Sequence, residues 1–202
     1  MDSPVANVAN IARALRTAGA TLDITSDAAA IARGAQLVLP GVGSFAAAMQ
    51  WLVDTRIDIA IRKAVANGAS LLGICVGHQL LFESSDEMGT TRGLGLVSGA
   101  VRRLEGPLPV PQIGWNRVRV GAAALGRPGA AGPTLFDGVE NEAFYFVHSY
   151  AARDAESEIA SSDYNGPFTA AIRQGRVFGV QFHPEKSSHA GLRVLRNFIA
   201  CS

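Results

Sequence analysis

The stretch that most restricts how this chain can fold runs from Leu71 to Phe82, with the sequence LLGICVGHQLLF. Aliphatic residues at 70–74 predict a short buried strand, and an apolar pattern with helical spacing begins after Gly77. A strand, a tight turn and a helix in this order resemble a nucleophile elbow, in which the central side chain is raised above the carboxyl edge of the sheet. Cys75 occupies that central position.

Two interpretations of Cys75 are open at this point. Glycines stand two residues before it and two residues after it, and they leave room where a side chain would collide with the neighbouring strand or helix. The N-terminus of the following helix favours an anion, and therefore the thiolate form of the sulfur. Most cysteines of intracellular domains, however, are buried apolar residues. The Gly-x-Cys-x-Gly pattern alone leaves both interpretations standing.

Predicted helices and strands alternate along most of the chain. Before the elbow, helices are expected at residues 5–15, at 26–33 with a serine or aspartate cap, and at 44–67 with a bend near 54–56; strands are expected at 22–24 and 35–39. After it, strands are expected at 100–104, 116–120 and 143–147, a hairpin at 169–172 and 177–182, and a closing helix at 187–200. The segment 121–138, rich in Gly, Ala and Pro, is expected to form a surface loop.

This order of elements predicts a doubly wound α/β fold of the flavodoxin-like kind, with a mostly parallel sheet covered by helices on both faces. At 202 residues, 48% of them hydrophobic, the chain has the length for one sizeable core, so residues 1–202 are expected to form a single domain. A functional site is expected at the carboxyl edge of the sheet.

Charge and cysteine content narrow the class of protein. The formal net charge of +1, without a cluster of Lys and Arg, argues against nucleic-acid binding. No apolar run is long enough to cross a bilayer and no signal segment opens the chain, so a soluble, cytoplasmic protein without membrane contact is expected. The two cysteines, Cys75 and Cys201, fit a reducing compartment. No Cys and His spacing resembles a zinc site, and neither a metal nor another cofactor is expected.

A base for the Cys75 thiol is expected at His183. This histidine follows an apolar strand and stands two residues before Glu185. Pro184 fixes the backbone between them, so both side chains can point to the same side. The imidazole would then take or share the thiol proton while the carboxylate holds its tautomer, which is the logic of a catalytic triad.

Three other histidines compete for the role of base, and the residues alone leave the choice open. His148 ends a predicted strand and is the strongest rival. His78 lies three residues from the cysteine on the same helix and is expected to point elsewhere, and His189 is expected at the surface. For the oxyanion, the amide of Val76 is the first donor expected in an elbow. A second donor could come from the glycine-containing turn 40–43, which is otherwise a simple turn.

Five segments of the chain resemble the class I, triad-type glutamine amidotransferases, and most closely the glutaminase subunits of imidazole glycerol phosphate synthases. The resemblance runs from about Asn7 to the C-terminus. The segments, in the family's order, are PGVGSF (40–45), GICVGHQLLF (73–82), GWN (114–116), FVHSY (146–150) and FHPEKS (182–187). Each segment by itself is a weak indication of the family, whereas all five in the family's order are a specific one.

The resemblance implies a reaction and the residues that perform it. Cys75 would be the nucleophile, His183 the general base and acid, and Glu185 the residue that orients the histidine. Attack on the side-chain amide of glutamine would give a γ-glutamyl thioester and ammonia, and water would then release glutamate.

The resemblance also implies binding residues. The oxyanion would be held by the amide of Val42 or Gly43 together with that of Val76. Gln79 and Glu87 match positions that hold the glutamine substrate, and the backbone at Ser149 and Tyr150 matches another. A carboxylate at position 87 suits the α-amino group of glutamine electrostatically.

The partner implied by the resemblance is a cyclase subunit with a (β/α)₈-barrel fold, which forms a heterodimer with the glutaminase and uses the ammonia in histidine biosynthesis. Trp115, Asn116 and Lys186 match residues that face this subunit. Ordinary core packing is the alternative for Trp115.

The chain departs from the family pattern at two places. Family members begin with an apolar strand that leads to an aspartate, whereas this chain begins Met1-Asp2-Ser3-Pro4, so most of that central strand is expected to be missing. Either the start is misassigned, the chain is truncated, or another segment fills the place. Gln112 stands where a histidine is common in the family.

Two rival functions remain. The first is another class I glutamine amidotransferase, such as the glutaminase of pyridoxal phosphate synthesis, against which the GWN and HPEKS segments argue. The second is a weakly active interaction subunit on the same fold, because fold alone does not establish activity.

Overall fold

The computed structural model describes residues 4–41, 43–121 and 134–201, with side chains from residue 8 onward. Its main sheet has six strands in the order β1-β2-β12-β11-β10-β7. Their bounds are β1 Gln36–Pro40, β2 Ser70–Ile74, β12 Val177–Val180, β11 Pro167–Gln174, β10 Glu158–Asp163 and β7 Arg119–Val120. Strand β2 pairs in parallel with β1 and with β12, and the remaining neighbours are antiparallel. The α/β fold class is confirmed, but the sheet is not mostly parallel as predicted, because parallel pairing is confined to β1, β2 and β12.

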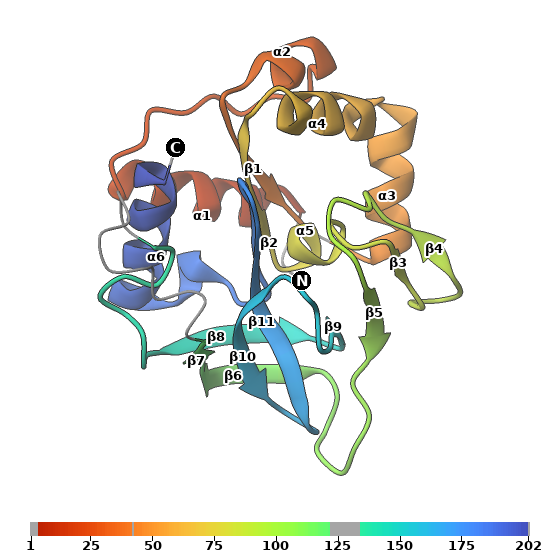
Figure 1. Ribbon diagram of the computed structural model, residues 1–202, viewed down its shortest axis with the longest axis vertical. Coiled ribbons are helices and arrows are strands. Elements are labelled where there is room, and N and C mark those ends of the chain that lie inside the picture. Colours follow the sequence, from red (N-terminus) through yellow and green to blue (C-terminus); the bar gives the residue numbers. More distant parts are fainter. Residues whose placement is uncertain (1–3, 42, 122–133, 202) are drawn as a thin grey trace.

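Two smaller sheets flank the main one. One has four strands in the order β4-β3-β5-β9, and the other pairs β6 with β8 in antiparallel fashion. Their bounds are β3 Ser84–Ser85, β4 Thr91–Arg92, β5 Ala100–Arg103, β9 Tyr150–Ala152, β6 Gln112–Arg117 and β8 Ala143–His148. Figure 1 shows β8 and β6 below the carboxyl end of β2.

Helices cover both faces of the parallel strands, as expected for a doubly wound fold. Helices α1 (Pro4–Thr17) and α6 (Ser188–Ala200) lie on one side, and α3 (Phe45–Asp54), α4 (Ile57–Ala66) and α5 (Val76–Gln79) lie on the other (Figure 1). Two hydrophobic clusters correspond to these sides, because one contains buried residues of α1 and α6 and the other contains those of α3 and α4. The sheet is therefore apolar on both faces where it carries Cys75.

The ends of the helices follow from local sequence. The Asp27 side chain accepts a hydrogen bond from the Ala29 amide and caps α2 (Ala28–Arg33), so aspartate is the cap rather than serine. The bend expected within 44–67 is a break between α3 and α4. Arg56 at this break has φ 58°, a left-handed conformation that a continuous helix cannot contain.

The strand expected at 22–24 is wrong. No described strand lies beside these residues, and a strand requires a neighbour to satisfy its backbone groups. Residues 1–3 lie outside the described residues, α1 starts at Pro4, and β1 is an edge of the sheet. Within the part of the chain that is described, no strand precedes β1, in line with the expectation that most of the family's first strand is missing.

Three further expectations need correction. The strand expected at 116–120 begins earlier, at Gln112, and is divided into β6 and β7; strand β10 was not predicted. Helix α5 has only four residues, because Leu80 to Phe82 turn into the core. Of the surface loop expected at 121–138, residues 122–133 lie outside the described part, whereas Leu135 and Phe136 are fully buried.

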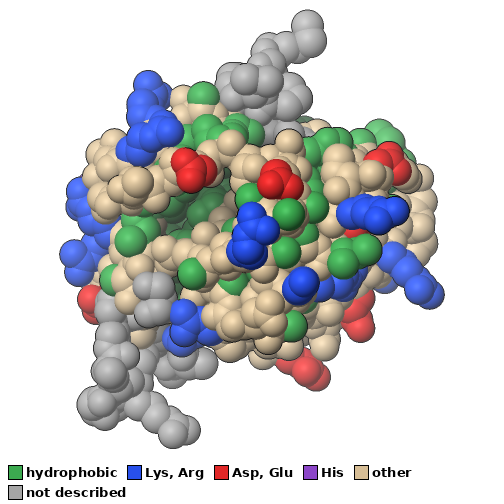
Figure 2. Space-filling view, turned by 90° about the horizontal axis from the view of Figure 1, so that it is seen from above, with side chains coloured by type: hydrophobic (Ala, Val, Ile, Leu, Met, Phe, Trp, Pro, Cys, Tyr) green, Lys and Arg blue, Asp and Glu red, His purple; other side chains and the backbone are tan. Residues whose placement is uncertain are grey.

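The surface carries charges of both signs. Figure 2 shows Lys and Arg side chains interspersed with Asp and Glu side chains on the face seen from above, around a hollow that exposes hydrophobic side chains. None of the helices in the described ranges is long and apolar enough to cross a membrane.

Candidate active site

Cys75 lies at the sharp turn between β2 and α5, and its backbone is strained. Its φ of 54° and ψ of −110° lie where L-residues are rarely found. A Cβ atom added to Gly77 would lie 2.0 Å from the Leu39 carbonyl oxygen, and one added to Gly73 would lie 2.5 Å from the Gly77 carbonyl oxygen. Both glycines are therefore needed for the close approach that the sequence pattern predicted.

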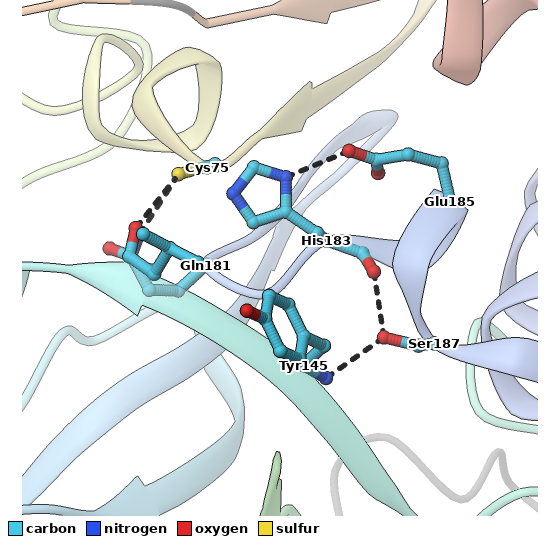
Figure 3. Close-up of polar contacts among 7 residues, drawn as sticks. Cys75, Tyr145, Gln181, His183, Glu185 and Ser187 are labelled. Carbon is cyan, nitrogen blue, oxygen red and sulfur yellow. Dashed lines mark hydrogen bonds and ion pairs between the residues drawn. The ribbon is translucent and has the colours of Figure 1, made fainter. Parts of the chain in front are cut away.

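His183 lies at the carboxyl end of β12 and points its imidazole at Cys75 (Figure 3). Its Nδ1 lies 2.8 Å from Oε1 of Glu185, and the Glu185 side chain is fully buried. The backbone is also held: the His183 amide donates to the Tyr145 carbonyl at 2.9 Å, and the Ser187 hydroxyl donates to the His183 carbonyl at 2.7 Å. Three side chains from two separate segments thus form a line of sulfur, imidazole and carboxylate.

The electrostatics of this line favour a charged imidazole. Burial lowers the pKa of His183, but the charge of Cys75, its hydrogen bond to the ring and the carboxylate of Glu185 together raise this pKa to about 10. His183 therefore holds a proton at neutral pH, beside the sulfur of Cys75.

The other three histidines are used differently. Burial, followed by the nearby charge of His148, lowers the pKa of His78 to about 3, and neither of its ring nitrogens has a hydrogen-bond partner among the described residues. Burial is also the largest cause that lowers the pKa of His148 to about 4. The His189 side chain is 79% exposed and lies 3.8 Å from Glu142. Of the four, His183 is the one that hydrogen-bonds the sulfur.

His148 bridges two strands and is occupied by this role. Its Nδ1 lies 2.9 Å from the Tyr150 carbonyl oxygen, and its Nε2 lies 2.9 Å from the side-chain oxygen of Gln112 on β6. A neutral imidazole donates only one hydrogen bond, so the Gln112 amide must present its N–H group rather than its oxygen to Nε2. Gln112, the departure from the family pattern, is thus a buried partner of His148.

The expected oxyanion donors converge only in part within the described structure. Val42 lies outside the described residues, and Gly43 has φ 79°. A Cβ atom added to Gly41 would lie 2.0 Å from the Gly77 amide nitrogen, so the turn after β1 packs directly on the first turn of α5. Val76 is the first residue of that helix. The turn after β1 and the elbow therefore lie at one place.

Three of the residues expected to bind substrate, Gln79, Glu87 and Tyr150, are hydrogen-bonded near the elbow or the turn after β1. Nε2 of Gln79 donates to the Tyr150 carbonyl at 2.8 Å and to Oε1 of Gln181 at 3.0 Å. Glu87 accepts from the Phe45 amide at 2.6 Å, at the start of α3 and just after the expected oxyanion turn. The carbonyl of Ser149 accepts from the Leu104 amide.

Two of the residues expected at the partner surface, Trp115 and Lys186, are exposed and lie against the half-buried Tyr145, which the sequence did not indicate. Trp115 is 55% exposed, so core packing is the wrong alternative for it. It pairs across β6 and β8 with Tyr145, with the two rings edge to face at 6.1 Å. Lys186 lies over the other ring, with Nζ 5.9 Å from the Tyr145 centroid. Asn116 instead bonds the Asp163 carbonyl through its side chain.

Sequence reasoning missed three residues of the site. Tyr145 and Ser187 hold the backbone of His183, since the Tyr145 amide donates to the Ser187 hydroxyl. Gln181 is fully buried with its Nε2 3.9 Å from the Cys75 sulfur. A polar residue inside the apolar run 177–182 was the signal that could have revealed it.

Comparison with known proteins places the chain among similar sequences. A family model described as glutamine amidotransferase class-I matches residues 1–201. The imidazole glycerol phosphate synthase subunit HisH of Moorella thermoacetica is 43% identical over 201 residues, covering 98% of this chain and 91% of the relative. The protein of the same name from Geobacillus thermodenitrificans is 41% identical over 207 residues, covering 98% and 93%.

Solved structures show the same fold at lower identity. A crystal structure of a glutamine amidotransferase matches with a TM-score of 0.72 and 20% identity, covering 95% of this chain and 91% of that one. The glutaminase domain of Trypanosoma brucei CTPS with bound acivicin matches with a TM-score of 0.63 and 14% identity, covering 94% and 84%. At these identities the likeness concerns the fold alone.

Proposed function

The chain belongs to the class-I glutamine amidotransferase family, and we propose that it hydrolyses glutamine at Cys75 as the glutaminase subunit of an imidazole glycerol phosphate synthase. The observation that carries the proposal is the line of Cys75, His183 and Glu185, with the imidazole between sulfur and carboxylate (Figure 3). The 41–43% identity to HisH subunits over nearly the whole chain supports this branch of the family.

The reaction proceeds in two halves at the sulfur. The Cys75 thiolate attacks the side-chain amide carbon of glutamine, and the carbonyl electrons move to oxygen. The His183 imidazolium gives its proton to the leaving nitrogen, so ammonia departs and a γ-glutamyl thioester remains. Water then attacks the thioester while His183 takes its proton, and the thiolate leaves from glutamate. Glu185 holds the ring in place for both transfers.

The negative charge that forms on the amide oxygen is received by backbone N–H groups. Val76 supplies one from the first turn of α5, and Val42 or Gly43 supplies the other from the turn after β1. The packing of Gly41 on the Gly77 amide supports this pairing, because it keeps the two turns in contact.

The glutamine substrate is held by groups around this oxyanion site. The carboxylate of Glu87 faces the α-amino group, and the backbone of Ser149 and Tyr150 borders the substrate. Both hydrogen bonds that the Gln79 side chain makes to described residues come from Nε2, so Oε1 is the atom available for contact with the substrate.

Ammonia passes to a cyclase subunit with a (β/α)₈-barrel fold, in a cytoplasmic heterodimer. This subunit docks on the group formed by Trp115, Tyr145 and Lys186, with Asn116 beside it. Strand β8 supports this assignment because it joins the two functions. The Tyr145 side chain of this strand faces the partner. Two backbone carbonyl groups of the same strand contact the catalytic residues, Tyr145 at the His183 amide and Val147 at the Cys75 sulfur.

Glutamate release from glutamine tests the activity. The purified chain is assayed alone and with the cyclase subunit, beside Cys75→Ala, and the variant is expected to be inactive. Glutaminase activity that survives in Cys75→Ala would rule out the mechanism. No activity with or without the cyclase would favour an interaction subunit on the same fold.

The docking surface is tested with the two tryptophans of the chain, which are about equally exposed at 55% and 51%. Trp115→Ala is expected to weaken binding to the cyclase by at least ~30-fold, as loss of a central aromatic anchor does. Trp51→Ala on α3 is the matched control and is expected to bind as the parent does. Equal binding by both variants, measured by titration calorimetry, would place the interface elsewhere.

A further inference from the structure

The Cys75 sulfur lies between a hydrogen-bond acceptor and a hydrogen-bond donor. The Val147 carbonyl oxygen is 3.8 Å from the sulfur. Nε2 of Gln181 is 3.9 Å from it, and Figure 3 shows the Gln181 side chain beside Cys75. A thiol can donate its proton to the carbonyl. A thiolate has no proton to give, so of these two groups only the Gln181 amide can stabilise the charged sulfur.

The orientation of the Gln181 amide is fixed by its neighbours. The backbone carbonyl of Tyr150 can only accept, so the Gln79 amide must turn its nitrogen toward it. The same nitrogen donates a second hydrogen bond, to Gln181. Gln181 must therefore accept this bond through its side-chain oxygen, Oε1. The remaining end of the Gln181 amide is the N–H group, and this end faces Cys75. The Tyr150 carbonyl, acting through Gln79, thus determines that the nitrogen of the Gln181 amide faces the Cys75 sulfur, and that its oxygen faces away.

Burial makes this chain of amides rigid. Gln181 is 0% exposed and Gln79 is 3% exposed, so water does not compete for their hydrogen bonds. The Gln181 backbone is also held, because its amide donates to the Ala170 carbonyl at 2.9 Å. Reversal of the Gln181 amide would place an oxygen against the sulfur and leave a buried donor of Gln79 without its partner.

We propose that Gln181 is a further catalytic residue whose amide N–H stabilises the Cys75 thiolate, and that Gln79 is a positioning residue which fixes that amide in the required orientation. This inference rests on the proposed function, in which Cys75 is the nucleophile. It assigns Gln181 a role beside His183, and it gives Gln79 a role besides contact with substrate.

Alkylation of Cys75 by iodoacetamide as a function of pH tests the proposal without any need for glutaminase activity. The full chain carries Cys201→Ser, so that Cys75 is its single thiol. In Gln181→Met the donor is lost without a change in charge, and the midpoint of alkylation is expected to rise by roughly one pH unit. In Gln79→Glu the new carboxylate accepts a hydrogen bond from the N–H group of Gln181, so the Gln181 amide turns its oxygen toward the sulfur. The pH midpoint of alkylation is therefore expected to rise in this variant as well.

Gln174→Glu is the matched control, because it makes the same substitution at an exposed position on β11. Its midpoint is expected to equal that of the parent. Circular dichroism checks that each variant is folded, and the equally uncharged Gln181→Leu replaces Gln181→Met in the comparison if the latter does not fold. In glutaminase assays, Gln181→Met is expected to lower kcat about tenfold with little change in KM, because the donor contacts sulfur rather than substrate.

Three outcomes would overturn the proposal. If the alkylation midpoint of Gln181→Met equals that of the parent, the Gln181 N–H group does not stabilise the thiolate. If the alkylation midpoint shifts in Gln181→Met but not in Gln79→Glu, Gln79 does not orient the Gln181 amide. An equal shift in Gln174→Glu makes the effect one of net charge. Absence of glutaminase activity in the parent would instead contradict the proposed function. The alkylation midpoints would still show whether Gln181 stabilises the Cys75 thiolate, because they do not depend on that activity.

Discussion

At the scale of single residues, the proton of His183 is held by the groups on either side of it. The pKa of His183 is raised to about 10, against burial, by the sulfur of Cys75 and the carboxylate of Glu185. Cys75→Ala removes one of these charges, so the pKa of His183 is expected to fall well below 10. The ring protons, followed by NMR between pH 5 and 11, measure it, with Cys201→Ala as the control. An unchanged pKa in Cys75→Ala would show that the sulfur is not the cause.

The same charge pair makes stability depend on pH. The folded-state pKa of His183 lies above its ordinary value of 6.5, so the folded protein binds this proton more tightly than the unfolded chain does. Its contribution to stability is complete below about pH 6.5 and is lost as the pH rises toward 10. Urea unfolding is therefore expected to show a larger loss of stability between pH 7 and 10 in the parent than in Cys75→Ala.

At the scale of elements, the elbow depends on close contact between backbones. A Cβ atom on Gly77 would meet the Leu39 carbonyl oxygen at 2.0 Å, and backbone cannot move aside as a flexible side chain can. Gly77→Ala is expected to displace α5, with loss of most glutaminase activity and a lower melting temperature. Gly121→Ala is the control, because its Cβ would lie 3.4 Å from the nearest atom. Equal activity in the two variants would contradict a tight elbow.

The turn that contains Phe136 is part of the core, although its sequence neighbours suggested a loop. The ring of this residue is fully buried and packs edge to face against Phe144 and Phe182, the residue directly before the catalytic histidine. Phe136→Ala is expected to lower the free energy of unfolding by about 3–5 kcal/mol, as measured by urea denaturation. Leu108→Ala, at a residue 47% exposed, serves as the control and is expected to change it by less than about 1 kcal/mol. A small loss in Phe136→Ala would show that the turn is not part of the core.

At the scale of the whole molecule, two buried histidines are expected to set the acid limit of stability. The pKa values of His78 and His148 are lowered to about 3 and about 4, chiefly by burial. The unfolded chain therefore takes up these protons first as the pH falls below 6.5, and stability present above that pH is lost toward pH 4. The expected loss is on the order of 1 kcal/mol per histidine and pH unit.

His78→Met tests this limit, because methionine is similarly long and does not titrate. Neither ring nitrogen of His78 has a partner within the described structure, so no hydrogen bond is lost. The variant is expected to lose less stability than the parent between pH 7 and 5 in urea denaturation. His189→Met, at an exposed histidine, is expected to follow the parent. Identical pH profiles for all three would assign the acid limit to other groups.

The sequence by itself determined the elements with strong local signals. The elbow, the broken helix at 44–67, the hairpin of β11 and β12 and the closing helix follow from apolar periodicity, glycine and capping residues. The pairing of Cys75 with His183 and Glu185 was expected only through the resemblance to the family, because the residues alone left His148 open as the base. These features depend on contacts within a few residues, or on the rule that parallel strands end at one edge of a sheet.

Only the tertiary structure decided what depends on a neighbour distant in sequence. Residues 22–24 have strand-like sequence but no strand beside them, and Phe136 is buried because it meets rings far along the chain. The role of Gln181 likewise depends on the Tyr150 carbonyl and on Gln79, from two other elements. An amide has the same sequence signal in either orientation, and only the groups packed around it decide which end faces the sulfur.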